Sequence, residues 1–217
     1  TLKRIYINNG NGGFEEVLNS PFGRMNKATA IFGDIDLDND IDVIISGVNN
    51  DLQNELKLYY NNGNGTYTES QTQDFSHILL AHNMELADFD NDGDLDFFIT
   101  GQTHTWAGSS SIYENNGGQF SFGSLGIPGG IGAYKDGDVN IIDIDNDGDL
   151  DIFLSGSNDH LDLYTRLYIN DGTGLFNLST NNFEGLYRSN SIVFDSDNDS
   201  DLDILISGTN SSGEHIC

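Results

Sequence analysis

The chain of 217 residues is long enough for one substantial domain or for several repeats that share a core. It carries 35 acidic and 8 basic residues, and the resulting net charge of −27 argues against nucleic acid or an anionic membrane as a partner. The single cysteine, Cys217, excludes a disulfide framework, and no apolar run is long enough for insertion into a membrane.

The first predicted element is a β-hairpin at residues 4–14. Its residues Ile5-Tyr6-Ile7 lead into Asn8-Asn9-Gly10, and branched or aromatic residues before Asn-Gly are a strong hairpin signal. The same pattern returns at residues 58–67, 112–120 and 167–176. The hairpin tyrosines Tyr6, Tyr59, Tyr113 and Tyr168 are 53, 54 and 55 residues apart, and we expect them to lie in the core.

The next predicted element is a strand–loop–strand unit. A short strand at residues 28–33 precedes a loop at residues 34–42, in which aspartate occupies every second position. The apolar run at residues 43–45 follows directly and ends at Ser46-Gly47. So short a run, rich in branched residues and closed by glycine, predicts a strand buried on both faces.

This unit occurs four times. The first aspartates of successive loops are 54, 55 and 52 residues apart, and a fixed period in this range is typical of solenoids, propellers and arrays. Strands are predicted before the later loops at residues 85–87, 139–142 and 192–194, and after them at residues 97–99, 152–154 and 204–206. The loop aspartates are Asp34, Asp36, Asp38, Asp40 and Asp42; Asp88, Asp90, Asp92, Asp94 and Asp96; Asp143, Asp145, Asp147, Asp149 and Asp151; and Asp195, Asp197, Asp199, Asp201 and Asp203.

The spacing of these aspartates predicts calcium binding. We number each loop from its first aspartate as position 1. Ca²⁺ takes about 6–8 oxygen ligands, and each loop offers carboxylate oxygens at positions 1, 3 and 5, a backbone carbonyl at position 7 and a further carboxylate. We expect about four ions, one per loop, which would reduce the net charge to about −19. Position 6 is glycine in the second and third loops (Gly93 and Gly148), but it is Asn39 in the first loop and Ser200 in the fourth. Because serine tolerates positive φ poorly, the fourth loop should bind most weakly.

Each period therefore contains four predicted strands. This arrangement is typical of a β-propeller blade, and we predict an all-β fold with about four repeats of ~54 residues in a single propeller domain over residues 1–217. The repeats would cover approximately residues 1–27 as half a blade, 28–80, 81–135, 136–188, and 189–217 as a second half-blade.

Half-blades at both ends would leave exposed strand edges and apolar faces. Three arrangements would cover them: closure of the chain into a four-bladed ring, pairing between chains into a ring or filament, or membership of a larger propeller. The sequence favours a larger propeller of seven or eight blades, because the chain stops at Cys217 where the next hairpin is expected. A head-to-tail filament ranks second.

The loops, together with hairpins such as Leu58-Tyr59-Tyr60-Asn61-Asn62-Gly63, resemble FG-GAP/VCBS-type repeats, the calcium-loop blades of the integrin α-subunit propeller. The resemblance covers nearly the whole chain. It implies side-chain ligands at positions 1, 3, 5 and 9 of each loop. It also implies backbone-carbonyl ligands at position 7, from Asp40, Asp94, Asp149 and Asp201.

We expect a non-catalytic, extracellular structural or adhesive module, since the millimolar calcium outside cells would fill loops of ordinary affinity. Its partner would be a protein or glycan on a surface. The alternatives are the propeller domain of a secreted polysaccharide-degrading enzyme, a carbohydrate-binding lectin, or a filament-forming subunit. The histidines share no zinc or catalytic spacing, although His104 and His160 follow equivalent strands and Trp106 could stack on a sugar. For these three residues, ordinary loop or packing roles are favoured.

Overall fold

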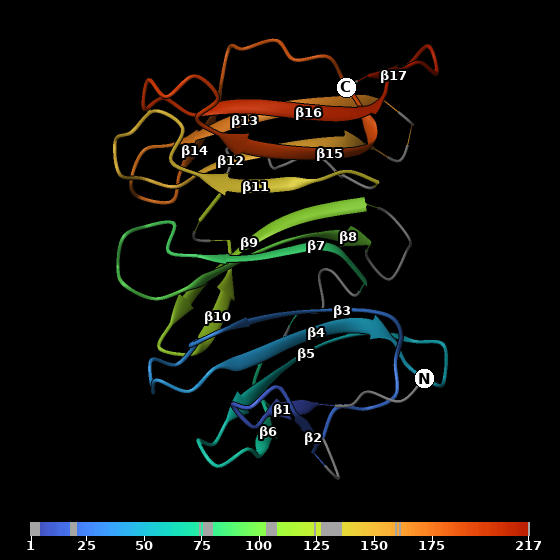
Figure 1. The fold of residues 1–217 in the computed structure, drawn as a ribbon, viewed down its shortest axis with the longest axis vertical. Helices are drawn as coiled ribbons and strands as arrows, with labels where there is room; N and C mark the ends of the chain where they lie inside the picture. Colours follow the sequence, from blue (N-terminus) through green and yellow to red (C-terminus); the bar gives the residue numbers. More distant parts are fainter. Residues whose placement is uncertain are drawn as a thin grey trace.

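The computed structural model describes residues 5–17, 21–73, 75, 80–102, 108–123, 125–126, 136–158, 160 and 162–216. Within these residues every regular element is a β-strand, which confirms the predicted all-β class. None of the described segments forms a helix long and apolar enough to cross a membrane. The larger sheets are stacked along the long axis of the molecule (Figure 1).

Three of the sheets are complete four-stranded antiparallel units, which we call blades 1, 2 and 3, and each follows chain order from its first strand to its fourth. Blade 1 contains β3 (Asn26–Gly33), β4 (Asp42–Val48), β5 (Asn54–Asn61) and β6 (Tyr67–Glu69). Blade 2 contains β7 (Leu80–Ala87), β8 (Asp96–Gln102), β9 (Gly108–Asn116) and β10 (Gln119–Phe122). Blade 3 contains β11 (Val139–Ile142), β12 (Asp151–Ser157), β13 (Leu163–Asn170) and β14 (Phe176–Leu178).

The two remaining sheets are smaller. The N-terminal hairpin consists of β1 (Tyr6–Asn8) and β2 (Phe14–Glu16), as predicted. Blade 4 consists of β15 (Tyr187–Phe194), β16 (Asp203–Thr209) and the short strand β17 (His215–Ile216), which the sequence analysis did not anticipate. β17 pairs with the end of β16, placing His215 opposite Thr209 and Ile216 opposite Gly208. The last blade therefore has the start of a third strand.

The core lies between the faces of neighbouring blades. The run after each loop alternates its side chains between the two faces, as the pleat requires. In β8, Phe97 and Ile99 pack into a cluster with Ile44 of blade 1, while Phe98 packs with Ile152 of blade 3. All three β8 side chains are fully buried, because a blade covers each face of the sheet. This is the two-sided burial that the short apolar runs predicted.

The outermost sheets depart from that prediction. In β16 the middle side chain of the apolar run, Leu205, is 52% exposed, and on β15 Ile192 is 54% exposed. The prediction of two-sided burial is therefore wrong for residues 204–206, because no described sheet packs on the outer face of blade 4. Likewise Tyr59, Tyr113 and Tyr168 are buried, whereas Tyr6 in the N-terminal hairpin is 51% exposed.

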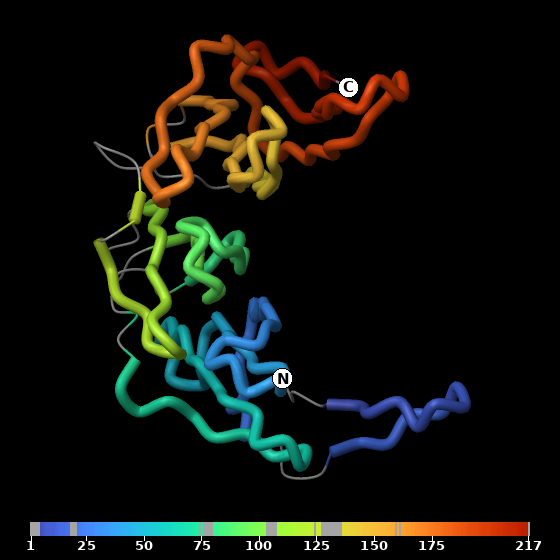
Figure 2. Tube along the Cα trace, turned by 90° about the vertical axis from the view of Figure 1, so that its left-hand side faces the viewer, coloured from blue at the N-terminus to red at the C-terminus, as the bar shows by residue number. Residues whose placement is uncertain are grey.

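The ring is not closed within the chain. β1 pairs with β2, whereas β16 pairs with β15 and β17, so residues 5–7 and 204–206 belong to different sheets. The N-terminal hairpin lies beside the blade 1 end of the stack and blade 4 forms the other end, and the hairpin projects away from the stacked sheets (Figures 1 and 2). The structure is thus an open series of propeller-like blades, which rules out the four-bladed ring for this arrangement.

Candidate metal centre

Each aspartate loop connects the first strand of a blade to its second. Every loop brings three carboxylates together so that one oxygen from each lies within 4.8 Å of the others. In the first three loops these are the aspartates of positions 1, 3 and 9, and in the fourth loop those of positions 1, 3 and 5. The groups are Asp34, Asp36 and Asp42; Asp88, Asp90 and Asp96; Asp143, Asp145 and Asp151; and Asp195, Asp197 and Asp199.

The aspartate of position 1 holds the turn of each loop. Its Oδ2 accepts a hydrogen bond from the backbone N–H of position 6, at 3.1 Å from Asn39 and 3.0 Å from Gly93, Gly148 and Ser200. Position 6 adopts positive φ in all four loops, with values of 72°, 97°, 96° and 77° in chain order. The expectation that this position turns through positive φ is confirmed, and Ser200 adopts a conformation that disfavours serine.

A second left-handed residue lies at position 4, which the sequence analysis did not single out. Leu37, Asn91, Asn146 and Asn198 have φ between 58° and 63°. Asparagine tolerates this region, and its recurrence in three loops was the signal that could have revealed it. Leucine does not tolerate it well, so the first loop carries strain at Leu37, whose side chain is 52% exposed.

The aspartate of position 9 fastens the loop to the rest of its blade. In blade 2, Asp96 accepts hydrogen bonds from the backbone N–H groups of Phe89 and Asn115, both at 2.9 Å. Asp42 and Asp151 make the same pair of bonds in blades 1 and 3, and all three side chains are fully buried. A carboxylate oxygen can accept more than one bond, so these oxygens remain able to face a cation.

An asparagine in the hairpin links neighbouring loops, a role that the sequence pattern does not reveal. The side-chain Nδ2 of Asn115 donates to the carbonyl of Leu95 in its own loop, at 3.1 Å, and to that of Ile35 in the preceding loop, at 2.8 Å. Asn170 repeats both contacts one blade later, with Leu150 and Phe89, at 3.1 and 2.8 Å. These two asparagines therefore link the first three loops in a hydrogen-bonded row.

The carboxylates of position 7 contact neighbouring groups outside the three-carboxylate clusters. Asp94 accepts a hydrogen bond from the N–H of Gly117 at 2.7 Å, and Asp149 accepts one from the side chain of Asn91 in the previous loop at 2.7 Å. At position 5, Oδ1 accepts the N–H of position 7 at 2.9 Å in every loop. The assignment of metal ligands to the loop aspartates stays a prediction at every position.

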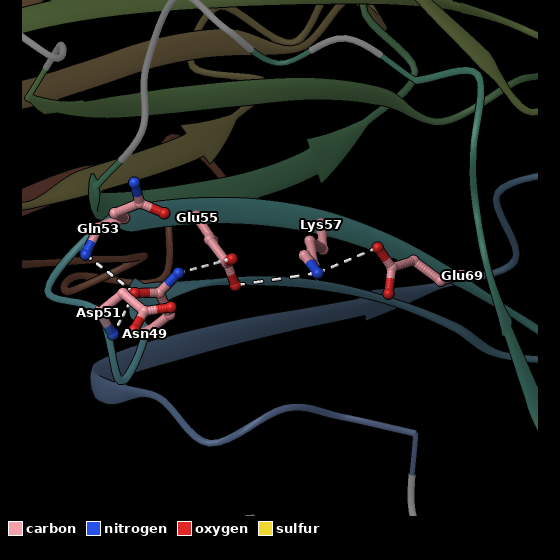
Figure 3. Close-up of polar contacts among 6 residues, drawn as sticks. All are labelled: Asn49, Asp51, Gln53, Glu55, Lys57 and Glu69. Carbon is pink, nitrogen blue, oxygen red and sulfur yellow. Dashed lines mark hydrogen bonds and ion pairs between the residues drawn. The ribbon is translucent and has the colours of Figure 1, made fainter.

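Among the described residues, no Lys or Arg side chain forms an ion pair with a loop aspartate. Between described side chains, ion pairs form at Lys57, whose Nζ lies 3.9 Å from Glu55 and 3.0 Å from Glu69, and none involves a loop aspartate (Figure 3). This group lies near the turn that Asn49 stabilises at the far end of β4, away from the loop.

Burial raises the pKa of several carboxyls in the clusters. Burial is the largest cause for Asp96, whose pKa is raised to about 7, and the charges of Asp90 and Asp92 add to the effect against the opposing backbone hydrogen bonds. Burial, followed by neighbouring aspartates, also raises the pKa values of Asp36 and Asp90. These shifts measure how unfavourable the unneutralised carboxylates are, and a bound cation would reverse them.

Two oxygens provide the test of whether a cation fits. Oδ1 of Asp34 and Oδ1 of Asp36 are buried and accept no hydrogen bond from the described residues. Buried carboxylate oxygens are expensive to leave without a partner. Both belong to carboxylates of the first three-carboxylate cluster, so a hard cation bound there would satisfy them.

The fourth loop differs from the others. Position 2 is Ser196, whose backbone N–H and hydroxyl both donate to Oδ2 of Asp203, whereas the other loops have apolar residues there. Asp203 is exposed, and these bonds lower its pKa. In the first three loops, the Oδ1 of the position 9 aspartate accepts the N–H of a hairpin asparagine.

Other candidates from the sequence contribute nothing to these clusters. His160 is exposed in the turn after β12, and its backbone N–H donates to Asn158 at 2.9 Å. His77, His104, Trp106 and Cys217 lie outside the described residues, so the suggested rim of loop histidines cannot be placed.

Comparison with known families agrees with this geometry. The model of the FG-GAP-like repeat matches the chain three times, over residues 34–99, 88–154 and 143–206. Each match begins at the first aspartate of one loop and extends into the strand after the next loop. A comparison with curated protein sequences finds no significant match.

Proposed function

The chain belongs to the FG-GAP-like repeat family, and from this membership and the four carboxylate clusters we propose that it is a calcium-binding structural or adhesive module that works outside cells. The observation that carries the metal assignment is the pair of buried oxygens on Asp34 and Asp36, which have no hydrogen-bond donor in the described structure. A bound ion in each loop would satisfy such oxygens and offset the repulsion among neighbouring carboxylates.

Calcium fits the donor set better than other biological cations. The clusters offer only carboxylate oxygens, which excludes the thiolate and imidazole ligands that zinc and copper prefer. Backbone carbonyls at position 7 would add to the coordination. A flexible loop with many oxygens suits Ca²⁺, with about 6–8 ligands, whereas Mg²⁺ demands a compact octahedron and retains water.

The ions would join the blades. The position 9 aspartate ties each loop to the third strand of its own blade, and the hairpin asparagine ties the loop to the preceding one. An ion that fixes these loops therefore stiffens the whole stack. Because protein oxygens would fill most of the coordination sphere, the ion has a structural role and leaves no open position for a substrate.

The proposed metal chemistry supports an extracellular location. Loops of ordinary affinity fill at the millimolar calcium concentration outside cells, and the strongly acidic surface suits recognition of a protein or glycan better than contact with nucleic acid. Recognition of a surface partner is the adhesive part of the proposal.

Calorimetric titration of chelator-treated protein tests the metal assignment. Calcium should bind with a stoichiometry approaching four per chain, while magnesium at equal concentration should bind far more weakly. No calcium-dependent heat, or equal response to both cations, would contradict the assignment. A glycan array and a turnover assay on acidic polysaccharides test the role: glycan binding would favour a lectin, and turnover would favour a secreted enzyme.

A further inference from the structure

A side chain of the second aspartate loop is bonded to the third loop. Nδ2 of Asn91, at position 4 of the second loop, donates to Oδ1 of Asp149 at 2.7 Å and to the backbone carbonyl of Gly172 at 3.4 Å. Asp149 is position 7 of the third loop, and Gly172 lies in the turn of the blade 3 hairpin. The contact therefore joins two carboxylate clusters that each draw their aspartates from a single loop.

Asn91 lies between two predicted calcium ligands of its own loop, Asp90 and Asp92. Its φ of 60° is left-handed, so the direction of its side chain depends on the loop keeping this uncommon conformation. An ion bound in the second loop would hold the backbone on both sides of Asn91. The side-chain amide would then be fixed in the direction that meets Asp149.

Asp149 is equally close to the predicted ligands of the third loop. Its backbone N–H donates to Oδ1 of Asp147, at position 5, at 2.9 Å. Its own backbone carbonyl is the predicted ligand of position 7. A hydrogen bond to the carboxylate of Asp149 therefore restrains a residue that supplies one ligand and contacts another, and bonds to a charged acceptor are among the stronger ones.

The first two loops, both fully described, lack this contact. Position 4 of the first loop is Leu37, which has no donor, and Asp94 at position 7 of the second loop accepts the N–H of Gly117 in its own blade. In the last pair of loops, Nδ2 of Asn146 lies 3.4 Å from Oδ1 of Asp201, which is longer than a typical bond. The link is therefore best formed between the second and third loops.

We propose that Asn91 couples the second and third calcium sites, so that an ion in either loop raises the affinity of the other. The inference rests on the proposed calcium function and concerns the regulation of the same sites. Asn91 is a positioning residue, because it acts through Asp149. Such coupling is reciprocal: filling the second loop favours the third by the same factor as filling the third favours the second.

The coupling opposes a second effect, the mutual repulsion of two divalent ions, which alone would weaken binding of the second ion. We expect the hydrogen bond to prevail and the affinity to rise about tenfold, within the usual range for coupled sites. The two loops would then fill over a narrower range of calcium concentration than independent sites. Blades 2 and 3 would stiffen in one step.

Nuclear magnetic resonance of the isotope-labelled chain measures the loops separately. The backbone N–H of position 6 donates to the position 1 aspartate in each loop, so the amide signals of Asn39, Gly93 and Gly148 report the first, second and third loops. Calcium is titrated into chelator-treated protein. We expect the signals of Gly93 and Gly148 to change together, and more steeply than binding at one site allows.

Asn91→Gly removes the side-chain amide and keeps a residue that accepts the left-handed φ. With the second loop filled, the calcium affinity of the third loop should fall about tenfold, although every residue of that loop is unchanged. Leu37→Gly is the matched control, because it makes the same backbone change at position 4 of the first loop, where no such bond exists. It should leave the affinity of the second loop unchanged.

Asp149→Ala tests the coupling from the other side. It removes the acceptor in the third loop and should lower the affinity of the second loop by the same factor of about ten. The effects of Asn91→Gly and Asp149→Ala on the second loop should not add when the two are combined, because both remove one bond.

The outcomes separate the coupling from the calcium function. The coupling is overturned if Asn91→Gly leaves the third loop unaffected, if Leu37→Gly weakens the second loop as much, or if Asp149→Ala leaves the second loop unaffected. Each of these results is compatible with calcium binding at every loop. If no loop of the parent responds to calcium, the proposed function fails and the coupling fails with it.

Discussion

Replacement of Asp96 by asparagine should stabilise the protein without calcium, and calcium should cancel or reverse this gain. Both carboxylate oxygens of Asp96 accept backbone N–H groups, so an amide would place one N–H against another and lose about 1–3 kcal/mol. The same replacement removes a buried charge. A pKa raised from 3.8 to about 7 corresponds to roughly 4 kcal/mol of destabilisation at about pH 8, where the unneutralised carboxyl is ionised.

Without calcium, the Asp96→Asn variant should therefore be about 1–3 kcal/mol more stable than the parent. Calcium at about a hundred times the dissociation constant stabilises the parent by about 2.7 kcal/mol that the variant lacks, so in calcium the variant should lose this advantage and be about equal to the parent or up to about 2 kcal/mol less stable. Urea unfolding in calcium and in chelator measures both values. Asp51→Asn is the matched control, because it removes one charge from an exposed turn. The reasoning would be refuted if Asp96→Asn lowered the unfolding free energy equally in the two solutions.

Three further predictions concern pH and the left-handed loop positions. Without calcium, the unfolding free energy should fall as pH rises from about 4 to about 7, because folded Asp96 keeps its proton up to a pKa of about 7 whereas the unfolded chain releases it near 3.8. Urea titrations at several pH values measure this free energy, and a rise with pH would contradict the prediction. Calorimetry should show the lowest calcium affinity at the fourth site, and Ser200→Gly should raise that affinity, since glycine accepts the φ of 77° without strain. An unchanged affinity would exclude the strained turn as the cause of weak binding. Leu37→Asn should raise the stability by about 1 kcal/mol in thermal melts, because asparagine tolerates the φ of 59°; a lower melting temperature would count against strain at this position.

The repeated pattern was enough to predict the blades that have neighbours. The residues 97–99 and 152–154 lie in buried strands, and Tyr59, Tyr113 and Tyr168 lie in the core, because both faces of these sheets are covered. The same pattern failed for residues 204–206, since a strand sequence cannot specify whether another sheet packs on it. Burial there depends on what lies beyond the described sheets.

The candidate site was predicted less completely. Aspartate spacing indicated the loops, and the structure brings three carboxylates of each loop together. The aspartate spacing did not reveal the role of Asn115 or Asn170, because their carbonyl partners in the preceding loop lie about 80 residues away in sequence. β17 was missed as well, since two residues carry no periodicity.

The most direct test of the metal assignment is anomalous scattering from crystals grown with calcium. The account predicts an anomalous peak beside each three-carboxylate cluster, including one within bonding distance of Oδ1 of Asp34 and Asp36, and the weakest peak at the fourth loop. Loops that keep their conformation without any peak at these clusters would contradict the account.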